Sequence, residues 1–275
     1  MNRIAVPLFD LAQTLESGQI FRYRKVDDLY LVAVRERFFR LRQSGGRLEF
    51  DGADAKFVRD FLDLDYDLDA ALGRLSRIRQ LRPAIAACRG LRIVRHDPWE
   101  CLISFICSTR SNIPKIKRSL NLLAQCHGSV VSCGGQTEHA FPPPGSLCNL
   151  ELLKTTGIGY RADYVMQTNR LCTNGMLERI AALPYPEARA ELMRFPGVGD
   201  KVADCVCLFS MRFREAFPVD VWVQRAMLEL FPGCGKNERQ IRQFAMQTFG
   251  PDAGYAEQYL FHYRRMMKKA MGYGL

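Results

Sequence analysis

Lys201 is the side chain in this sequence whose position best suits chemistry. It follows a Pro-Gly-Val-Gly turn, and residues 187–195 before the turn and 200–213 after it carry the apolar and long side chains of two helices. Lys201 therefore falls in the first turn of the second helix. A cation is disfavoured at a helix N-terminus, and this favours the neutral amine that a lysine nucleophile requires. A lysine that binds phosphate is the alternative.

Asp220 is a second candidate for chemistry. It stands at the start of the next apolar helical segment, DVWVQRAMLELF. Its simplest role is the N-cap of that helix, because an aspartate side chain accepts hydrogen bonds from the free N–H groups of a first turn. A chemical role beside Lys201 is equally open at this point, and the two roles can coexist.

The turn between the two helices, Pro196-Gly197-Val198-Gly199, could bind a nucleic-acid backbone. Glycines let the main chain approach a surface closely, and the free N–H groups at the start of the following helix suit a phosphate. A tight turn between two packed helices is an alternative of similar weight, since a single Gly-x-Gly is common.

The composition favours an acidic partner. The 275 residues include 39 Lys and Arg against 29 Asp and Glu, a formal net charge of +10. The 48% hydrophobic and 25% charged fractions are those of a globular protein with one or two domains, which excludes a disordered or fibrous chain. The apolar stretches are too short for a membrane span, and the N-terminus has the pattern of neither a secretion signal nor a transit peptide. We expect a soluble intracellular protein, in the cytoplasm or nucleoid if the source is bacterial.

The ten cysteines form no compact framework in a chain of this length and include no Cys-x-x-Cys pair. We therefore expect reduced thiols and no iron–sulfur cluster. The cysteines and histidines between residues 126 and 148 do not have the spacing of a zinc site. The prediction is that the chain binds no metal and no organic cofactor.

Two kinds of periodicity divide the chain into elements. Residues 20–50 are rich in aromatic and β-branched residues, with a Ser-Gly-Gly turn between two alternating runs, which predicts antiparallel strands. The apolar spacing then becomes helical, interrupted by the Gly- and Pro-rich stretch 127–149 and by Gly-rich turns. The predicted fold class is α+β: an antiparallel β-rich N-terminal domain over residues 1–90, and a helical body over residues 91–275 whose C-terminal helix closes the cleft of the reactive groups.

Several segments gain meaning when they are taken together: FPGVGDKVADCVCLF followed by FPVDVW, SGQIFRY at 17–23, DPWECLISFICS at 97–108, GIGYRA at 157–162 and GYAEQYLF at 254–261. In their order along the chain, these segments resemble the helix-hairpin-helix DNA glycosylases, and specifically the bifunctional 8-oxoguanine DNA glycosylase/lyases, over nearly the whole chain. The resemblance implies a base excision repair enzyme that flips 8-oxoguanine out of double-stranded DNA, excises it through a lysine Schiff base and cleaves the strand by β-elimination. The expected partner is double-stranded DNA that contains oxidised guanine, bound by a monomer.

The resemblance also implies roles for the two reactive residues. Lys201 matches the lysine that attacks C1′ of the damaged nucleotide, displaces the base and forms the Schiff base. Asp220 matches the aspartate that stabilises the positive charge developing on the sugar and assists proton transfers.

A base pocket follows from the same resemblance. The Gly18 carbonyl would accept the N7–H that oxidised guanine has and guanine lacks, and Cys205 and Phe261 would stack on the base. Glu257 stands where the family commonly has a glutamine that reads the Watson–Crick edge, and a carboxylate can accept from the guanine N1–H and N2–H groups. The adjacent Gln258 is an alternative reader. The structural interpretations are an ordinary turn for the glycine and core packing for Cys205 and Phe261.

Contacts with DNA around the extruded base are implied as well. Tyr160 matches an aromatic wedge, and Arg161 matches an arginine that contacts the orphaned cytosine. Arg110 and Lys115 depart from the family's gap-filling asparagine and second cytosine-reading arginine, which leaves a preference for cytosine open. The other predicted DNA-binding residues are Asn112 and the hairpin residues Gly197, Val198 and Gly199.

Trp222 is a further departure, because the family often has a histidine there, near the reactive phosphate. The basic run Arg264, Arg265, Lys268 and Lys269 could touch phosphates or form a solvated helix face. Three other functions stay open: a hairpin glycosylase for another lesion, a DNA-binding module without catalysis, and a structural nucleoid protein.

Overall fold

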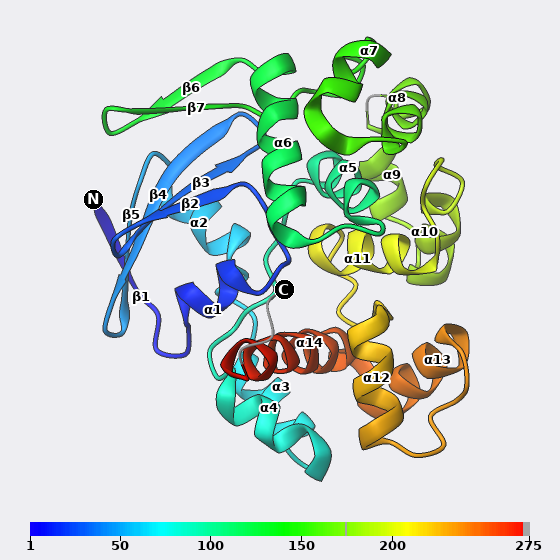
Figure 1. Cartoon of the computed structure of the whole chain (residues 1–275). Helices are drawn as coiled ribbons and strands as arrows, with labels where there is room; N and C mark the ends of the chain where they lie inside the picture. Colours follow the sequence, from blue (N-terminus) through cyan, green and yellow to red (C-terminus); the bar gives the residue numbers. More distant parts are fainter. Residues whose placement is uncertain (174, 272–275) are drawn as a thin grey trace.

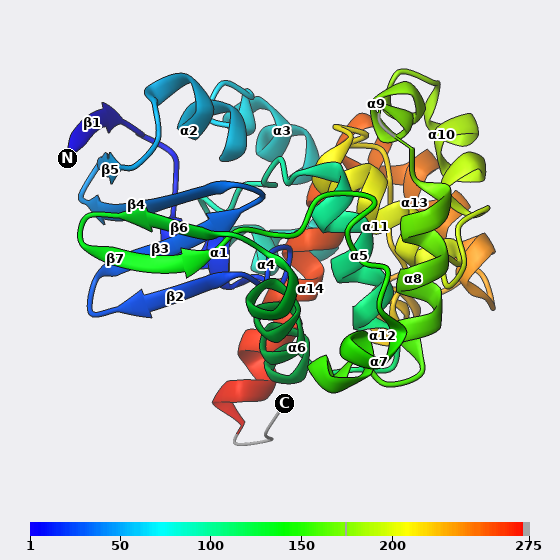
Figure 2. The same cartoon turned by 90° about the horizontal axis from the view of Figure 1, so that it is seen from above.

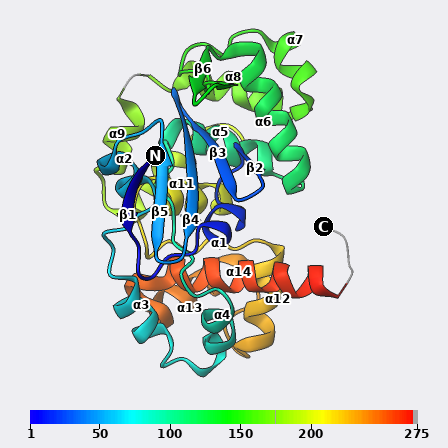
Figure 3. The same cartoon turned by 90° about the vertical axis from the view of Figure 1, so that its left-hand side faces the viewer.

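Five antiparallel strands form the sheet of the N-terminal part, as the alternating pattern predicted. In the computed structural model, which describes residues 1–173 and 175–271, the strands lie in the order β1-β5-β4-β3-β2. Figure 3 shows them side by side, with helix α1 (Leu11–Glu16) between β1 and β2 along the chain. Their bounds are β1 Asn2–Ala5, β2 Tyr23–Val26, β3 Leu29–Val34, β4 Arg37–Ser44 and β5 Arg47–Asp51.

One face of the sheet is buried against helix α2 (Ala55–Phe61). Val32 of β3 pairs with Phe39 of β4, and both side chains are fully buried. The ring of Phe39 meets that of Phe61 edge-on, with 5.5 Å between centroids. These residues set the register, because a slip by one position would turn the large side chains to the opposite face.

Helices α5 (Pro98–Ser108) and α11 (Asp200–Ser210) pack against each other in the helical body. Residues 99–107 of α5 are all buried, which is the pattern of a helix enclosed on every side. Helix α6 (Ile113–His127) packs against α5, and α14 (Ala253–Ala270) contacts α12 (Val221–Leu230), as Figure 1 shows. The other helices are α3 Leu68–Leu75, η1 Arg79–Leu81, α4 Arg82–Ala87, α7 Leu150–Leu153, η2 Lys154–Ile158, α8 Arg161–Leu171, α9 Met176–Ala181, α10 Tyr185–Leu192, α13 Glu238–Phe249 and η3 Gly250–Asp252.

The two large apolar cores divide the chain earlier than the predicted boundary at residue 90. The core beneath the sheet extends to Leu62, and Val94 returns to it. Leu68, Leu72 and Leu75 of α3 and Ala84 and Ile85 of α4 belong to the core of the helical body. The apolar residues of these helices therefore pack with the second part of the chain, where α4 lies against α14.

The stretch 127–149, predicted as an interruption between helices, contains a second sheet. Strands β6 (Val130–Cys133) and β7 (Gln136–His139) pair antiparallel and lie over the main sheet (Figure 2). Cys133 packs there with Leu31 and Phe38. The two strands have four residues each and are mostly partly buried or exposed, so they lack the long apolar alternation that identifies the main strands.

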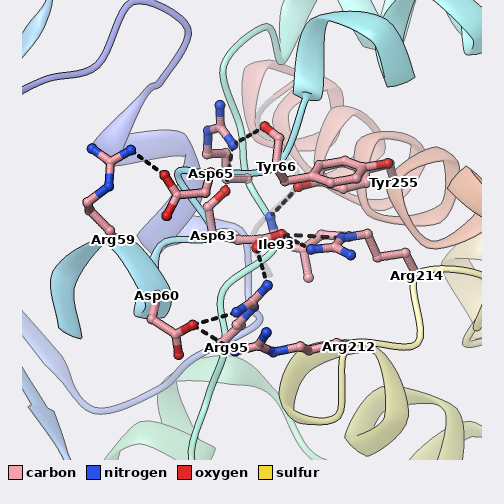
Figure 4. Close-up of polar contacts among 11 residues, drawn as sticks. Arg59, Asp60, Asp63, Asp65, Tyr66, Ile93, Arg95, Arg212, Arg214 and Tyr255 are labelled. Atoms are coloured by element: carbon pink, nitrogen blue, oxygen red, sulfur yellow. Dashed lines mark hydrogen bonds and ion pairs between the residues drawn. The ribbon is translucent and has the colours of Figure 1, made fainter. Parts of the chain in front are cut away.

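A polar network joins the segment after α2 to the segment after α11. Asp63 is buried, and its two oxygens accept from Arg95 (2.8 Å) and Arg214 (2.6 Å). The Arg214 guanidinium lies 4.0 Å from the ring centre of Tyr66, which stacks on Tyr255 of α14. Figure 4 shows how one carboxylate thereby connects segments that are far apart in the sequence.

No helix within residues 1–173 and 175–271 has the length and apolar character needed to cross a membrane. All ten cysteines are free thiols; Cys126 and Cys148 are exposed and the others are buried. The described part of the chain contains no group of three or more His, Cys, Asp or Glu side chains arranged to hold a metal ion.

Candidate active site

The Pro196–Gly199 turn joins α10 to α11 and forms the helix-hairpin-helix that the sequence predicted. Gly197 has a φ of +81°, and an added Cβ would lie 2.7 Å from the ring of Tyr164, so the main chain passes close to α8. The early N–H groups of α11 receive no cap from any described side chain. They can therefore bind a phosphate, whereas Val198 is buried and would contact DNA only through its main chain.

Lys201 lies in the first turn of α11, half-buried against α5. Its Nζ is 3.5 Å from the Ser108 hydroxyl oxygen and 4.9 Å from the centre of the Phe105 ring. These contacts place the amine where α5 and α11 meet.

Asp220 is the N-cap of α12, and this predicted role is confirmed. Its Oδ1 accepts from the N–H groups of Trp222 (2.9 Å) and Val223 (2.8 Å). Both bonds use the same oxygen, which leaves Oδ2 for another partner. Burial raises the pKa of both Glu257 and Cys205, and the charge of Asp220 adds to both shifts, so the carboxylate acts electrostatically on its surroundings as well as on the helix.

Cys205 lies one turn after Lys201 and is buried. Burial raises the pKa of its thiol to about 12, which keeps the sulfur protonated near neutral pH. A neutral thiol offers a soft apolar surface to a base ring and does not compete with the lysine as a nucleophile.

Gly18 and Phe261, which are far apart in the sequence, meet in the structure. Gly18 follows α1 with a φ of +89°, and an added Cβ would lie 3.3 Å from Phe261 Cε1. Ile113 Cδ1 and Arg265 Nη1 would each lie 3.2 Å from the same point. The turn thus presents main chain instead of a side chain beside the aromatic ring, which is the close approach that the predicted pocket requires.

Glu257 and Gln258 of α14 have different surroundings. Gln258 is buried and donates to the Ser17 carbonyl (3.3 Å). Glu257 is 5% exposed, and its Oε2 has no hydrogen-bond partner among the described residues. Burial first, and then the charge of Asp220, raise the pKa of the Glu257 carboxyl well above its usual range, while Lys201 opposes the shift. Glu257 is therefore the member of the pair that keeps a free polar atom near the reactive residues.

Arg161 is turned into the protein. It is 4% exposed, and its guanidinium donates to the carbonyls of Thr109 (2.8 Å), Arg110 (3.2 Å) and Ile158 (3.1 Å). These bonds hold the loop between α5 and α6 beside the turn that precedes α8. A contact between Arg161 and an orphaned base would require an exchange of these bonds.

Tyr160 is exposed, and its ring meets Tyr164 edge-on. An exposed aromatic of this kind suits insertion into a base stack. Arg110 and Lys115 are exposed beside the start of α6, where Asn112 Oδ1 accepts from the Lys115 N–H (3.0 Å) and caps the helix. The bonds of Arg161 to this loop therefore hold Arg110 close to the turn that carries Tyr160.

The basic run near the C-terminus is partly packed. Lys268 Nζ lies 4.6 Å from the ring centre of Trp222, and Arg264 pairs with Glu229 (2.6 Å). Arg265 stacks on Phe261 at 5.4 Å and donates to the carbonyl of Glu16 (3.3 Å). Arg264, Arg265 and Lys268 are therefore half-buried, each with a partner on the protein, and contact with phosphates stays a prediction.

Sequence reasoning missed three residues of this site: Ser108 beside Lys201, and Ile113 and Arg265 beside Gly18. Ser108 lies within a matched segment and Arg265 within the basic run, but neither pattern specified a partner. Only the packing of α5, α6 and α14 around α1 and α11 brings them to these positions.

The chain combines a β-sheet part with a helical body. A lysine follows the glycine hairpin, and an aspartate caps the next helix. These features define the class of helix-hairpin-helix DNA glycosylases. The 3-methyladenine DNA glycosylase from Archaeoglobus fulgidus has this fold, with a TM-score of 0.82 over 97% of this chain and 99% of that chain. At 17% identity the likeness concerns the fold alone.

Sequence comparison narrows the class to one family. Residues 3–102 match the family described as 8-oxoguanine DNA glycosylase, N-terminal domain. The probable N-glycosylase/DNA lyase of Methanothermobacter thermautotrophicus is 32% identical over 96% of this chain and 96% of that protein. The 8-oxoguanine glycosylase/lyase of Clostridium acetobutylicum, solved in complex with double-stranded DNA containing cytosine opposite 8-oxoguanine, is 33% identical, with a TM-score of 0.90 over 94% of this chain and 93% of that chain. The chain belongs to the 8-oxoguanine DNA glycosylase/lyase family, as its motifs indicated.

Proposed function

We propose that this chain removes 8-oxoguanine from double-stranded DNA and then cleaves the strand at the abasic site, with Lys201 as the nucleophile. The observation that carries the proposal is the placement of Lys201 and Cys205 on successive turns of α11, with Asp220 at the start of α12, in a member of this family. The homologous complex with 8-oxoguanine DNA supports double-stranded DNA as the partner.

The chemistry begins at the sugar of the damaged nucleotide. The Lys201 amine attacks C1′, the bond from C1′ to N9 breaks, and the base leaves with the electron pair and takes up a proton. Positive charge develops on the sugar as the base departs, and the Asp220 carboxylate stabilises it. The sugar ring then opens to an imine between Nζ and C1′, and loss of a C2′ proton expels the 3′ phosphate by β-elimination.

The base must leave the stack to reach this site. Cys205 and Phe261 enclose the two faces of the flipped ring. The Gly18 carbonyl accepts from the N7–H of 8-oxoguanine, whereas guanine has a lone pair at N7 that would oppose the same oxygen. One hydrogen bond thus separates the lesion from the normal base, and Glu257 contacts the Watson–Crick edge.

The surrounding groups bind the DNA. The hairpin N–H groups of Gly197–Gly199 and α11 take a phosphate, Tyr160 enters the gap left by the base, and Arg110, Asn112 and Lys115 contact the opposite strand. All of these groups come from one chain, so a monomer suffices. The net charge of +10 makes the affinity fall as salt concentration rises.

Borohydride trapping tests the proposal on duplexes that carry one 8-oxoguanine opposite each of the four bases. The wild type and a Lys236→Gln control, in which an exposed lysine is changed, should form a covalent adduct, and Lys201→Gln should form none. Variation of the yield with the opposite base would report what Arg110 and Lys115 contribute. Tight binding without any adduct or free base would overturn the proposal and leave a DNA-binding module.

A further inference from the structure

Glu257 is a buried carboxyl group with an unused acceptor. It lies in the first half of α14, it is 5% exposed, and Oε2 has no partner among the described residues. A buried polar oxygen without a partner loses its hydrogen bonds to water and gains none in return, which destabilises the folded state. An atom of this kind, close to Lys201 and Asp220, indicates a ligand that supplies the missing donor.

The rotation of α14 is set by its neighbours. Gln258 donates to the carbonyl of Ser17 and Arg265 to the carbonyl of Glu16, the two residues that precede Gly18. These two bonds tie α14 to the turn that carries the Gly18 carbonyl. Gln258 could replace Glu257 in the pocket only if α14 turned and broke them, so the group available at the pocket is an acid and not an amide.

The difference between acid and amide decides which base edges fit. An ionised carboxylate only accepts hydrogen bonds, whereas an amide both donates and accepts. The Watson–Crick edge of 8-oxoguanine presents two adjacent donors, N1–H and the N2 amino group. The corresponding edge of 8-oxoadenine presents an acceptor at N1 beside the N6 amino donor, which an amide can match and a carboxylate cannot.

We propose that Glu257 restricts the pocket to oxidised purines whose Watson–Crick edge carries two adjacent donors, and that it excludes the 8-oxoadenine edge, which a glutamine in its place would admit. This inference rests on the proposed function, because the base must enter between Cys205 and Phe261.

Glu257 excludes 8-oxoadenine only when its carboxyl group is ionised. Several neighbouring groups influence whether it is ionised. Lys201, Asp204 and Cys205 act on it from α11, and Asp220 acts from the start of α12. Burial and the two aspartates raise the pKa of the Glu257 carboxyl, and Lys201 lowers it. The two donors of 8-oxoguanine favour the ionised form, so binding of this lesion releases a proton. A protonated Glu257 can donate to N1 of 8-oxoadenine, and discrimination therefore increases as pH rises.

Single-turnover excision from two duplexes tests this inference. One duplex carries 8-oxoguanine and the other 8-oxoadenine, whose N7–H and O8 groups are the same, so only the six-membered ring edge differs. The ratio of the two rates is measured from pH 6 to pH 9 for the wild type, Glu257→Gln and Glu238→Gln, a control in which an exposed glutamate of α13 is changed.

We expect the preference of the wild type and the control for 8-oxoguanine to rise about 10-fold or more across this range, the size expected when a bidentate pair is lost. Glu257→Gln should show a lower preference that does not change with pH. If Glu257→Gln is folded but too slow to assay, affinities for the same duplexes with a 2′-fluoro sugar, which resists excision, supply the ratio. If it does not fold, the pH profile of the wild type alone decides the question.

Two results would overturn the inference: a wild-type preference that does not vary with pH, or an unchanged preference in Glu257→Gln. Either result, with 8-oxoguanine still excised and trapped by borohydride, leaves the proposed function intact. The absence of both excision and trapping for every duplex would instead reject the proposed function itself.

Discussion

Burial controls the ionisation of two side chains at the candidate pocket. Burial is the largest influence on both Cys205 and Glu257 and raises the pKa of each, and Lys201 acts in the opposite direction on both. When a bound base excludes the remaining water, the desolvation free energy is lower for neutral groups than for charged ones. Burial therefore favours the neutral form of both the Cys205 thiol and the Glu257 carboxyl.

Glu257→Gln should change stability in a pH-dependent way. Because the pKa of Glu257 is raised in the folded state, the folded state keeps a proton that the unfolded chain has lost, and stability falls as pH rises above about 4.3, the unfolded value. Glutamine has the same shape and no charge to bury. The variant should therefore equal the wild type near pH 4 and exceed it at pH 8, by about 1–3 kcal/mol.

Urea unfolding at both pH values measures this difference. Glu238→Gln, which changes an exposed glutamate, should follow the wild type at both. A difference between wild type and Glu257→Gln that is the same at pH 4 and pH 8 would show that the charge of Glu257 is not the cause.

At the scale of elements, α14 supplies one face to the pocket. Glu257, Phe261 and Arg265 follow one another at intervals of four residues, so they project from the same side of the helix. Gln258 lies beside this face and bonds to the turn after α1. The hydrogen bonds of Gln258 and Arg265 connect α14 to that turn. They therefore fix the positions of Glu257, Phe261 and the Gly18 carbonyl relative to one another.

The hairpin provides a matched pair of glycine substitutions. Gly197→Ala should destabilise the protein by about 1–3 kcal/mol and weaken DNA binding, because Gly197 has a φ of +81° and the new Cβ would lie 2.7 Å from the Tyr164 ring. Gly199→Ala should have little effect on stability, because Gly199 has an extended backbone and nothing lies within 4 Å of the added atom. Thermal unfolding and a binding titration with duplex DNA test both variants. Equal losses in the two would contradict this account of the turn.

For the whole molecule, the Asp63 network joins the sheet part to the helical body. Asp63→Ala should lower the free energy of unfolding by about 3–5 kcal/mol, because Arg95 and Arg214 would lose the buried carboxylate that they share. Asp65→Ala is the matched control, since Asp65 is exposed and pairs only with the exposed Arg59, and it should cost under about 1 kcal/mol. Urea unfolding measures both, and similar losses for the two variants would show that the network does not hold the parts together.

Several features of the fold and the site were predictable from the sequence because they depend on local pattern. The alternation over residues 20–50 identified the strands, since a period of two can bury only one face of a strand. The Pro-Gly-Val-Gly turn located the hairpin, and with it Lys201 in a first turn and Asp220 as a cap. The hairpin β6–β7 was missed because strands of four residues are too short to show such a pattern.

Tertiary structure alone decided which distant residues meet. It placed Gly18 against Phe261, and it let Gln258 donate to the Ser17 carbonyl. It also left the Oε2 atom of Glu257 without a partner among the described residues, although Glu257 and Gln258 are neighbours in the sequence. It also buried Arg161 against the carbonyls of the loop after α5 and assigned α3 and α4 to the helical core. The physical reason is that sequence periodicity specifies which face of an element is apolar, whereas the partner of each polar group depends on how those faces pack together in three dimensions.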